Sequence, residues 1–115
     1  SGGQRQALSL VMATTGETRA LLLDEHTAAL DPRTAEIVMA LTESIVRTAG
    51  LTAIMVTHSM RLALDHGDRT LMLHRGRVVM DLIGDDRART SVGDLLDRFR
   101  REQGEVLAGD ALLLE

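Results

Sequence analysis

Several residue types are missing from this chain, and each absence excludes a class of site. All 13 basic residues are arginine, so the sequence has no lysine and cannot contain the phosphate-binding loop G-x-x-x-x-G-K-[ST]. With no cysteine, it has neither a disulfide framework nor a thiolate metal site, which fits a reducing compartment. Phe99 is the only aromatic residue, so the chain offers no aromatic platform for stacking nucleic-acid bases or an adenine.

Charge and hydropathy argue against two further roles. The net charge of -4 and the pI near 5.5 disfavour a broad nucleic-acid surface, which needs clustered positive charge. No apolar run reaches about 18 residues, so we expect neither a membrane-spanning helix nor a signal peptide, and any membrane role should be indirect. The 115 residues, 44% hydrophobic and 26% charged, predict a soluble globular domain or part of one.

Two adjacent carboxylates follow a short apolar run. The run from Ala20 to Leu23 predicts a buried parallel strand, and Asp24 and Glu25 stand at its end. Such a strand would deliver Asp24 toward a hydrated Mg²⁺ and Glu25 toward an attacking water. A solvated strand end is the alternative, but carboxylates that end a wholly apolar strand more often form a metal or water site.

A glycine-rich tetrapeptide opens the chain and precedes a predicted helix. The residues are Ser1, Gly2, Gly3 and Gln4, with Ser1 suited to the N-cap. At a helix N-terminus, backbone N–H groups and the helix dipole favour an anion, while a capped helix start is an equally good reading. The expected buried face of this helix is Leu8, Val11 and Met12, and Gly16 offers its stop.

A second helix and a second strand follow. Asp31 suits the N-cap and Pro32 the first helical position, and Ala49-Gly50 ends the helix. The expected buried face is Ile37, Leu41 and Ile45. Leu51 to Val56 is again read as a buried strand, and a strand-helix-strand crossover places the two strands side by side and parallel.

The crossover predicts where the polar residues meet. Asp24 and Glu25 follow the first strand and His58 follows the second, so all three should share the carboxyl edge of one sheet. Ligands bind at this edge in open α/β sheets. A lone histidine is usually only a polar loop residue, but its place beside Glu25 favours a site.

The remaining sequence predicts smaller elements. Met60, Ala63 and Leu64 indicate a short helix stopped by Gly67. Arg75-Gly76 is read as the turn of a hairpin between Thr70–His74 and Arg77–Asp81. Ser91 and Asp94 match a capping box, followed by an apolar face of Val92, Leu95, Leu96 and Phe99.

In combination, three segments resemble the nucleotide-binding subunits of ABC transporters. SGGQRQ from Ser1 is similar to the signature loop, LLLDEHTAALD from Leu21 to the Walker B strand with its D-loop, and VTHS from Val56 to the switch-histidine loop. The resemblance implies an α/β fold: a partial P-loop NTPase (RecA-like) sheet with flanking helices, without the Walker A half. Residues 1–101 would be the C-terminal part of an ABC ATPase domain and residues 102–115 a tail.

The resemblance also implies residue roles, cofactors and partners. Ser1, Gly2, Gly3 and Gln4 would contact the γ-phosphate of ATP held mainly by a second ATPase subunit in a head-to-tail dimer, and Asp31 would work across that seam. Asp24 would orient Mg²⁺ through water, Glu25 would polarise the attacking water, and His58 would sense the γ-phosphate. The LDEHTAALDP form resembles bacterial amino-acid importers. The subunit would lie peripherally on the cytoplasmic face of the cell membrane. Transmembrane permease subunits would be its partners, a solute-binding protein would be an indirect one, and no nucleic acid would bind.

Two departures from the family pattern carry expectations. The phosphate loop is absent, so we expect a segment of a longer subunit that is inactive by itself. Without the Walker A strand, Thr52 to Val56 should have an unpaired edge, and the hairpin should lose its bridge to the sheet. The second departure is His26, where most of the family has proline, read here as a tolerated turn substitution rather than an electrostatic tuner.

Two other function classes stay open on the sequence. A soluble ABC-type ATPase of DNA repair or translation would carry the same three motifs without a membrane partner. A catalytically silent interaction domain is the third possibility.

Overall fold

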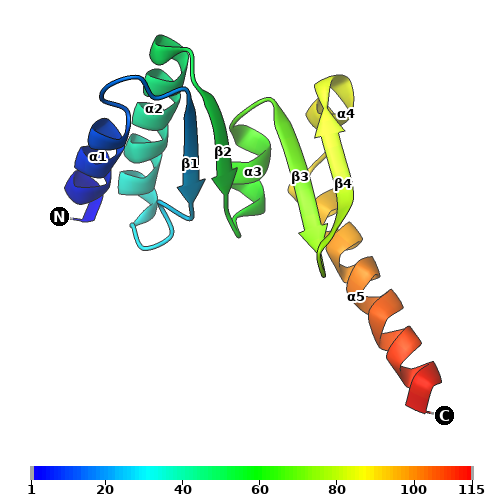
Figure 1. The fold of residues 1–115 in the computed structure, drawn as a ribbon. Coiled ribbons are helices and arrows are strands. Elements are labelled where there is room, and N and C mark those ends of the chain that lie inside the picture. The colour runs from blue at the N-terminus through cyan, green and yellow to red at the C-terminus, as the bar shows by residue number, and fades with distance from the viewer. Residues whose placement is uncertain (1, 115) are drawn as a thin grey trace. The chain divides into compact units, whose positions relative to one another are not determined.

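The chain has a mixed α/β fold that divides into two compact units, residues 1–58 and residues 59–115 (Figure 1). The structure is a computed structural model that describes residues 2–114, with the backbone alone for residues 105–114. The first unit contains α1 (Gly2–Ala13), β1 (Ala20–Asp24), α2 (Pro32–Ala49) and β2 (Thr52–Val56). The second contains α3 (Met60–Asp65), β3 (Arg69–His74), β4 (Arg77–Ile83), α4 (Gly84–Ala88) and α5 (Val92–Leu114).

The two strands of the first unit are parallel neighbours, as the crossover predicts. Their register runs from Ala20 opposite Thr52 to Asp24 opposite Val56. Among the described residues β2 pairs with β1 alone, so the expected unpaired edge is present. Parallel pairing is what sends both strand ends to one edge of the sheet.

The ends of α2 follow from its sequence. Asp31 is the N-cap, its Oδ2 accepting a hydrogen bond from Thr34 N at 3.2 Å, and Pro32 begins the helix. Gly50 closes the helix in the left-handed conformation, with φ 62°, and its N–H donates to Arg47 O. Both predicted boundaries are confirmed.

The core of the first unit lies between the helices and one face of the strands. Leu10, Leu21 and Leu23 are buried, and a set of partly buried side chains packs against them: Leu41, Ile45, Val46, Leu51 and Met55. The helix faces agree with the prediction only in part, because Leu8, Val11, Met12 and Ile37 are exposed. In α1 the inward face is marked by Gly3 and Leu10, which lie two turns apart, and a glycine carries no apolar signal.

The expectation that both strands are buried is wrong for one face of each strand. Leu22 is 75% exposed, Ile54 59% and Val56 55%. Successive strand side chains point to opposite faces, and in the first unit the helices cover the face that carries Leu21 and Leu23. The other face of the parallel pair is therefore open in the described residues.

The hairpin of the second unit forms a sheet of its own, as expected. β3 and β4 are antiparallel, with an irregularity between Met72 and Leu73. Arg75 and Gly76 both have positive φ, 49° and 76°, which is the geometry of a tight two-residue turn. The predicted turn position is confirmed.

Helix α5 begins at the predicted capping box. Ser91 N donates to Asp94 Oδ2 at 2.9 Å, and Asp94 N donates to Ser91 Oγ at 3.0 Å. Leu95 is 2% exposed, and the Phe99 ring meets the His74 ring edge-on at 5.8 Å. The helix backbone continues past residue 102 to Leu114, so the division into residues 1–101 and 102–115 stays a prediction.

Helix α4 was not predicted, and its Arg87 ties the second unit together. The guanidinium donates to Thr70 Oγ1 at 2.9 Å, to His66 O at 2.6 Å and to Ala63 O at 3.3 Å. The last two acceptors belong to the end of α3 and the turn after it. No helix in the described part of the chain combines the length and apolar character needed to cross a membrane.

We predict that Gly3→Ala destabilises the first unit through Thr34. A Cβ on Gly3 would overlap Thr34 Cγ2, and overpacking of this kind costs about 1–3 kcal/mol, partly offset by the better helix propensity of alanine. In a Thr34→Ser background, which lacks that methyl group, the same change should cost less. Urea unfolding of the four variants measures the difference.

Gly104→Ala is the matched control, because this helical glycine has no atom within 4 Å of the added Cβ. An equal cost of Gly3→Ala in the threonine and serine backgrounds would show that the overlap is not what excludes the side chain.

We predict that Arg87→Met destabilises the second unit by about 1–3 kcal/mol, because the partly buried His66 carbonyl oxygen and Thr70 hydroxyl oxygen each lose a charged donor. Arg89→Met is the matched control, since the side-chain contact of Arg89 within residues 2–104 is an exposed ion pair with Asp86. The urea midpoint should fall for the first variant and stay unchanged for the second. Equal midpoints for the two variants would contradict this account of α4.

Candidate functional site

Two of the predicted site residues meet at the carboxyl edge of the parallel strands. Glu25 directly follows β1 and His58 lies two residues after β2. His58 Nε2 is 2.8 Å from Glu25 Oε1, and the two side chains are 94% and 35% exposed. The contact therefore joins the ends of both strands in a position that water and a ligand can reach.

The backbone of Glu25 fixes where its carboxylate starts. Glu25 N donates to Val56 O at 2.8 Å, which continues the strand ladder beyond the last residue of β1. Its φ is 51°, a left-handed conformation that costs a non-glycine residue about 1–2 kcal/mol. Ala28 N donates to Glu25 O at 3.0 Å and closes the turn that follows. Strain of this kind clusters at functional sites.

Asp24 is the last residue of β1 and lies opposite Val56 in the register. It is exposed and adjoins Glu25, so two carboxylates start from one strand end. Among the described residues no group of three or more histidine and carboxylate side chains gathers closely enough to hold a metal ion.

The glycine-rich segment forms the first turn of α1. Figure 1 shows that the N-terminal ends of α1 and α2 lie at the same edge of the first unit as the carboxyl ends of β1 and β2. Helix N-termini carry partial positive charge, so this edge favours an anion. Gly2, Gly3 and Gln4 are within α1, whereas Ser1 lies outside the described residues.

The two glycines also have a packing reason. A Cβ on Gly2 would lie 3.1 Å from Leu30 Cδ2, and one on Gly3 would overlap Thr34. The sequence suggested close approach to an anion, and the structure adds close approach of α1 to the start of α2. A substitution at Gly3 therefore tests packing as well as any ligand contact.

Asp31 lies at the same corner, as the cap of α2. Hydrogen bonds from the side chain and then the backbone of Thr34 lower the pKa of Asp31, so the carboxylate is charged. Thr34 thus contacts Asp31 on one side and faces Gly3 on the other. The predicted residues form two groups, the Glu25–His58 pair and the Gly3–Asp31 corner, joined by the turn between β1 and α2.

His26 has a defined contact that the sequence did not reveal. Its Nε2 lies 3.1 Å from Thr42 Oγ1 on α2, and burial lowers the pKa of His26, which favours the neutral ring. Thr42 stands in the middle of a helix, 16 residues away, where a threonine carries no special pattern. Thr27, next in the turn, is also buried at 7% exposure.

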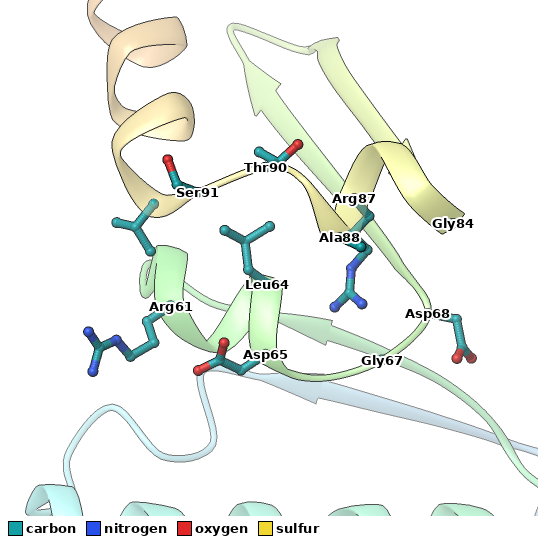
Figure 2. Close-up of a pocket in the computed structure, with 11 residues that line it drawn as sticks. Arg61, Leu64, Asp65, Gly67, Asp68, Gly84, Arg87, Ala88, Thr90 and Ser91 are labelled. Carbon is teal, nitrogen blue, oxygen red and sulfur yellow. The ribbon is translucent and has the colours of Figure 1, made fainter.

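A cleft of about 690 Å³ lies in the second unit, between α3, α4 and the start of α5 (Figure 2). Figure 2 shows Arg61 and Arg87 at its wall together with Asp65 and Asp68, so its charges are of both signs. None of the predicted site residues lines it. The strand-end edge of the first unit is the better candidate site.

Comparison with characterised proteins finds relatives that are named as ATP-binding proteins of transport systems. A tyrosine transport ATP-binding protein of Clostridioides difficile is 50% identical over 99 residues, which cover 86% of this chain and 39% of that protein. A methionine import ATP-binding protein of Burkholderia thailandensis is 36% identical over 118 aligned residues, covering 100% of this chain and 31% of that protein. A methionine import ATP-binding protein of Rhodospirillum rubrum is 43% identical over 79 residues, covering 69% and 22%.

No protein-family model matches the chain, and no solved structure matches it. The chain spans 39% and 31% of the length of the tyrosine and methionine relatives, so it corresponds to a minor part of each. The match nevertheless extends over most or all of the present sequence. The chain therefore belongs to the family of ABC transporter ATP-binding subunits, and it aligns with less than two fifths of the length of these two relatives.

Proposed function

We propose that the chain is part of the ATP-hydrolysing subunit of a bacterial importer of amino acids or similar small solutes. The observation that carries the proposal is the 2.8 Å contact between His58 and Glu25 at the carboxyl edge of two parallel strands. Ligands of open α/β sheets bind at this edge. The names of the relatives, tyrosine transport and methionine import, support transport of amino acids.

Glu25 is the proposed general base. Its Oε1 contacts His58, which leaves Oε2 to accept a proton from a water molecule. As the water oxygen attacks the γ-phosphorus, the bond to the bridging oxygen breaks, and ADP and inorganic phosphate form. The Glu25 side chain is 35% exposed, so water can reach the carboxylate.

His58 is proposed to sense the nucleotide. Its ring is almost fully exposed and is held by Glu25 alone among the contacts described above. An imidazole N–H donates well to a phosphate oxygen, so an entering γ-phosphate would compete with Glu25 for the ring. Binding of the nucleotide would then release the Glu25 carboxylate from its contact with His58.

Mg²⁺ is proposed to bind with the nucleotide and not to a cage built from this chain alone. Mg²⁺ is usually held by one or two carboxylates together with substrate phosphates and water, and Asp24 at the strand end fits that donor set. When bound, the ion neutralises charge on the phosphates. Asp24 supplies a negative charge beside Glu25, at the start of the same turn.

The remaining phosphate contacts must come from outside these residues, because the chain has no lysine for a phosphate loop. We propose that Gly2, Gly3 and Gln4, with Ser1 before them, face the γ-phosphate of ATP held mainly by a second ATPase subunit, and that Asp31 acts across the same seam. The positive ends of α1 and α2 at this edge support the proposal.

The proposed partners follow from that arrangement. When ATP binds, two ATPase subunits would close head to tail at the cytoplasmic face of the membrane. This motion would be transmitted to transmembrane permease subunits. A solute-binding protein would act indirectly. The transported molecule is selected by those other subunits, so this chain does not discriminate between tyrosine, methionine and related solutes.

In the complete subunit, Glu25→Gln should lower kcat for ATP hydrolysis by at least about 10²-fold, because glutamine cannot accept the proton. Affinity for Mg²⁺-ATP should stay within about twofold, since the side chain keeps its shape. Steady-state phosphate release and nucleotide binding measure the two quantities.

Glu36→Gln is the matched control, the same chemical change at an exposed position of α2. Unchanged turnover in Glu25→Gln would remove Glu25 from its role, and loss of nucleotide binding would indicate a structural role instead.

The 115-residue chain alone should show no Mg²⁺-dependent ATP hydrolysis, because it has no lysine-containing phosphate loop. A phosphate-release assay on the purified chain, with Glu25→Gln as its blank, measures this. Hydrolysis that disappears in the blank would show that the chain is competent by itself.

A further inference from the structure

The His26–Thr42 contact determines which nitrogen of the His26 ring carries the proton. Thr42 Oγ1 donates to Val38 O at 2.8 Å, the shorter of its two side-chain contacts, and this bond takes its single hydroxyl proton. Thr42 Oγ1 must then accept from His26 Nε2 at 3.1 Å. His26 is therefore the tautomer protonated at Nε2, with Nδ1 bare.

The unprotonated His26 Nδ1 is in an unfavourable environment. His26 Nδ1 is buried and has no hydrogen-bond partner among the described residues. A buried acceptor without a donor is normally disfavoured, and each one in a folded protein calls for an explanation. A proton on this nitrogen would be buried without an acceptor, so the site favours the single neutral tautomer.

The His26–Thr42 contact lies between a strained residue and a buried one. The preceding residue, Glu25, has a left-handed φ of 51°, and the following residue, Thr27, is buried. The strand side of the turn is held by Glu25 N bonding to Val56 O. The helix side is held by His26, because Thr42 belongs to α2 and is itself only 4% exposed.

We propose that His26 is a positioning residue for Glu25: its Nε2–H bond to Thr42 holds the turn against α2 and so keeps the Glu25 carboxylate against His58. The inference rests on the proposed function for its catalytic consequence, while the bond and the tautomer stand on geometry alone. Without the bond, the strained φ of Glu25 is free to relax. The carboxylate would then lose its fixed starting point.

The first experiment reads the tautomer in the 115-residue chain. Long-range ¹H–¹⁵N correlation spectra distinguish the two neutral tautomers by the shifts of the ring nitrogens. We expect His26 protonated at Nε2 in the wild type, and a changed pair of shifts in Thr42→Val, which removes the acceptor at constant shape. A ring protonated at Nδ1, or shifts that Thr42→Val leaves unchanged, would overturn the proposal.

The second experiment measures kcat and KM for ATP in the complete subunit. Thr42→Val and His26→Leu should each lower kcat by about tenfold to about a hundredfold, since a misplacement of about 1 Å can cost that much. KM should stay within about twofold, because nucleotide contacts are unchanged. His26→Gln, whose amide nitrogen can donate from about the same place as Nε2, should restore most of the rate.

Thr48→Val, the same change at an exposed position of α2, is the matched control. If His26→Leu fails to fold, Thr42→Val still decides, because it leaves the imidazole in place. Wild-type turnover in Thr42→Val, with Glu25→Gln inactive, would overturn the positioning role and leave the proposed function standing. A wild-type subunit without ATPase activity would overturn the proposed function. The ¹H–¹⁵N correlation spectra would still test the His26–Thr42 bond, because they do not depend on activity.

Discussion

The parallel pairing of β1 with β2 is the constraint on which the candidate site depends. Because Asp24 lies opposite Val56, the next backbone N–H, that of Glu25, reaches Val56 O and continues the ladder. This extra bond places Glu25 in line with the end of β2, and His58 follows two residues later. A register shift of one residue would turn Glu25 to the other face and separate the pair.

The predicted site residues differ in whether helix packing also explains them. Gly3 and Asp31, which the sequence suggests for a nucleotide, also account for how α1 and α2 pack, through Thr34. Glu25 has a left-handed backbone and a partly exposed carboxylate whose described contact is with His58, at the same sheet edge. The edge it occupies also receives the positive ends of two helices, which suits a negatively charged ligand.

Most of the fold was predictable because local signals dominate it. Asp31-Pro32, Gly50, Arg75-Gly76 and the Ser91–Asp94 box each specify a backbone conformation by themselves, and the structure has all four. The faces of α1 and the burial of the strands were predicted less well. A glycine at position 3 gives no apolar signal, and the exposure of Leu22 and Ile54 depends on what covers the sheet and not on their own chemistry. The His26–Thr42 bond joins residues that are 16 positions apart in the sequence, so no local pattern predicts it.

The central claim is that the Glu25–His58 pair faces the terminal phosphate of a bound nucleotide. A crystal structure of the complete subunit with Mg²⁺ and a non-hydrolysable ATP analogue tests it most directly. We expect the γ-phosphate at the carboxyl edge of β1 and β2, with a water molecule between it and the Glu25 carboxylate. A nucleotide bound elsewhere, or a Glu25 carboxylate turned away from the phosphate with no water between them, would contradict it.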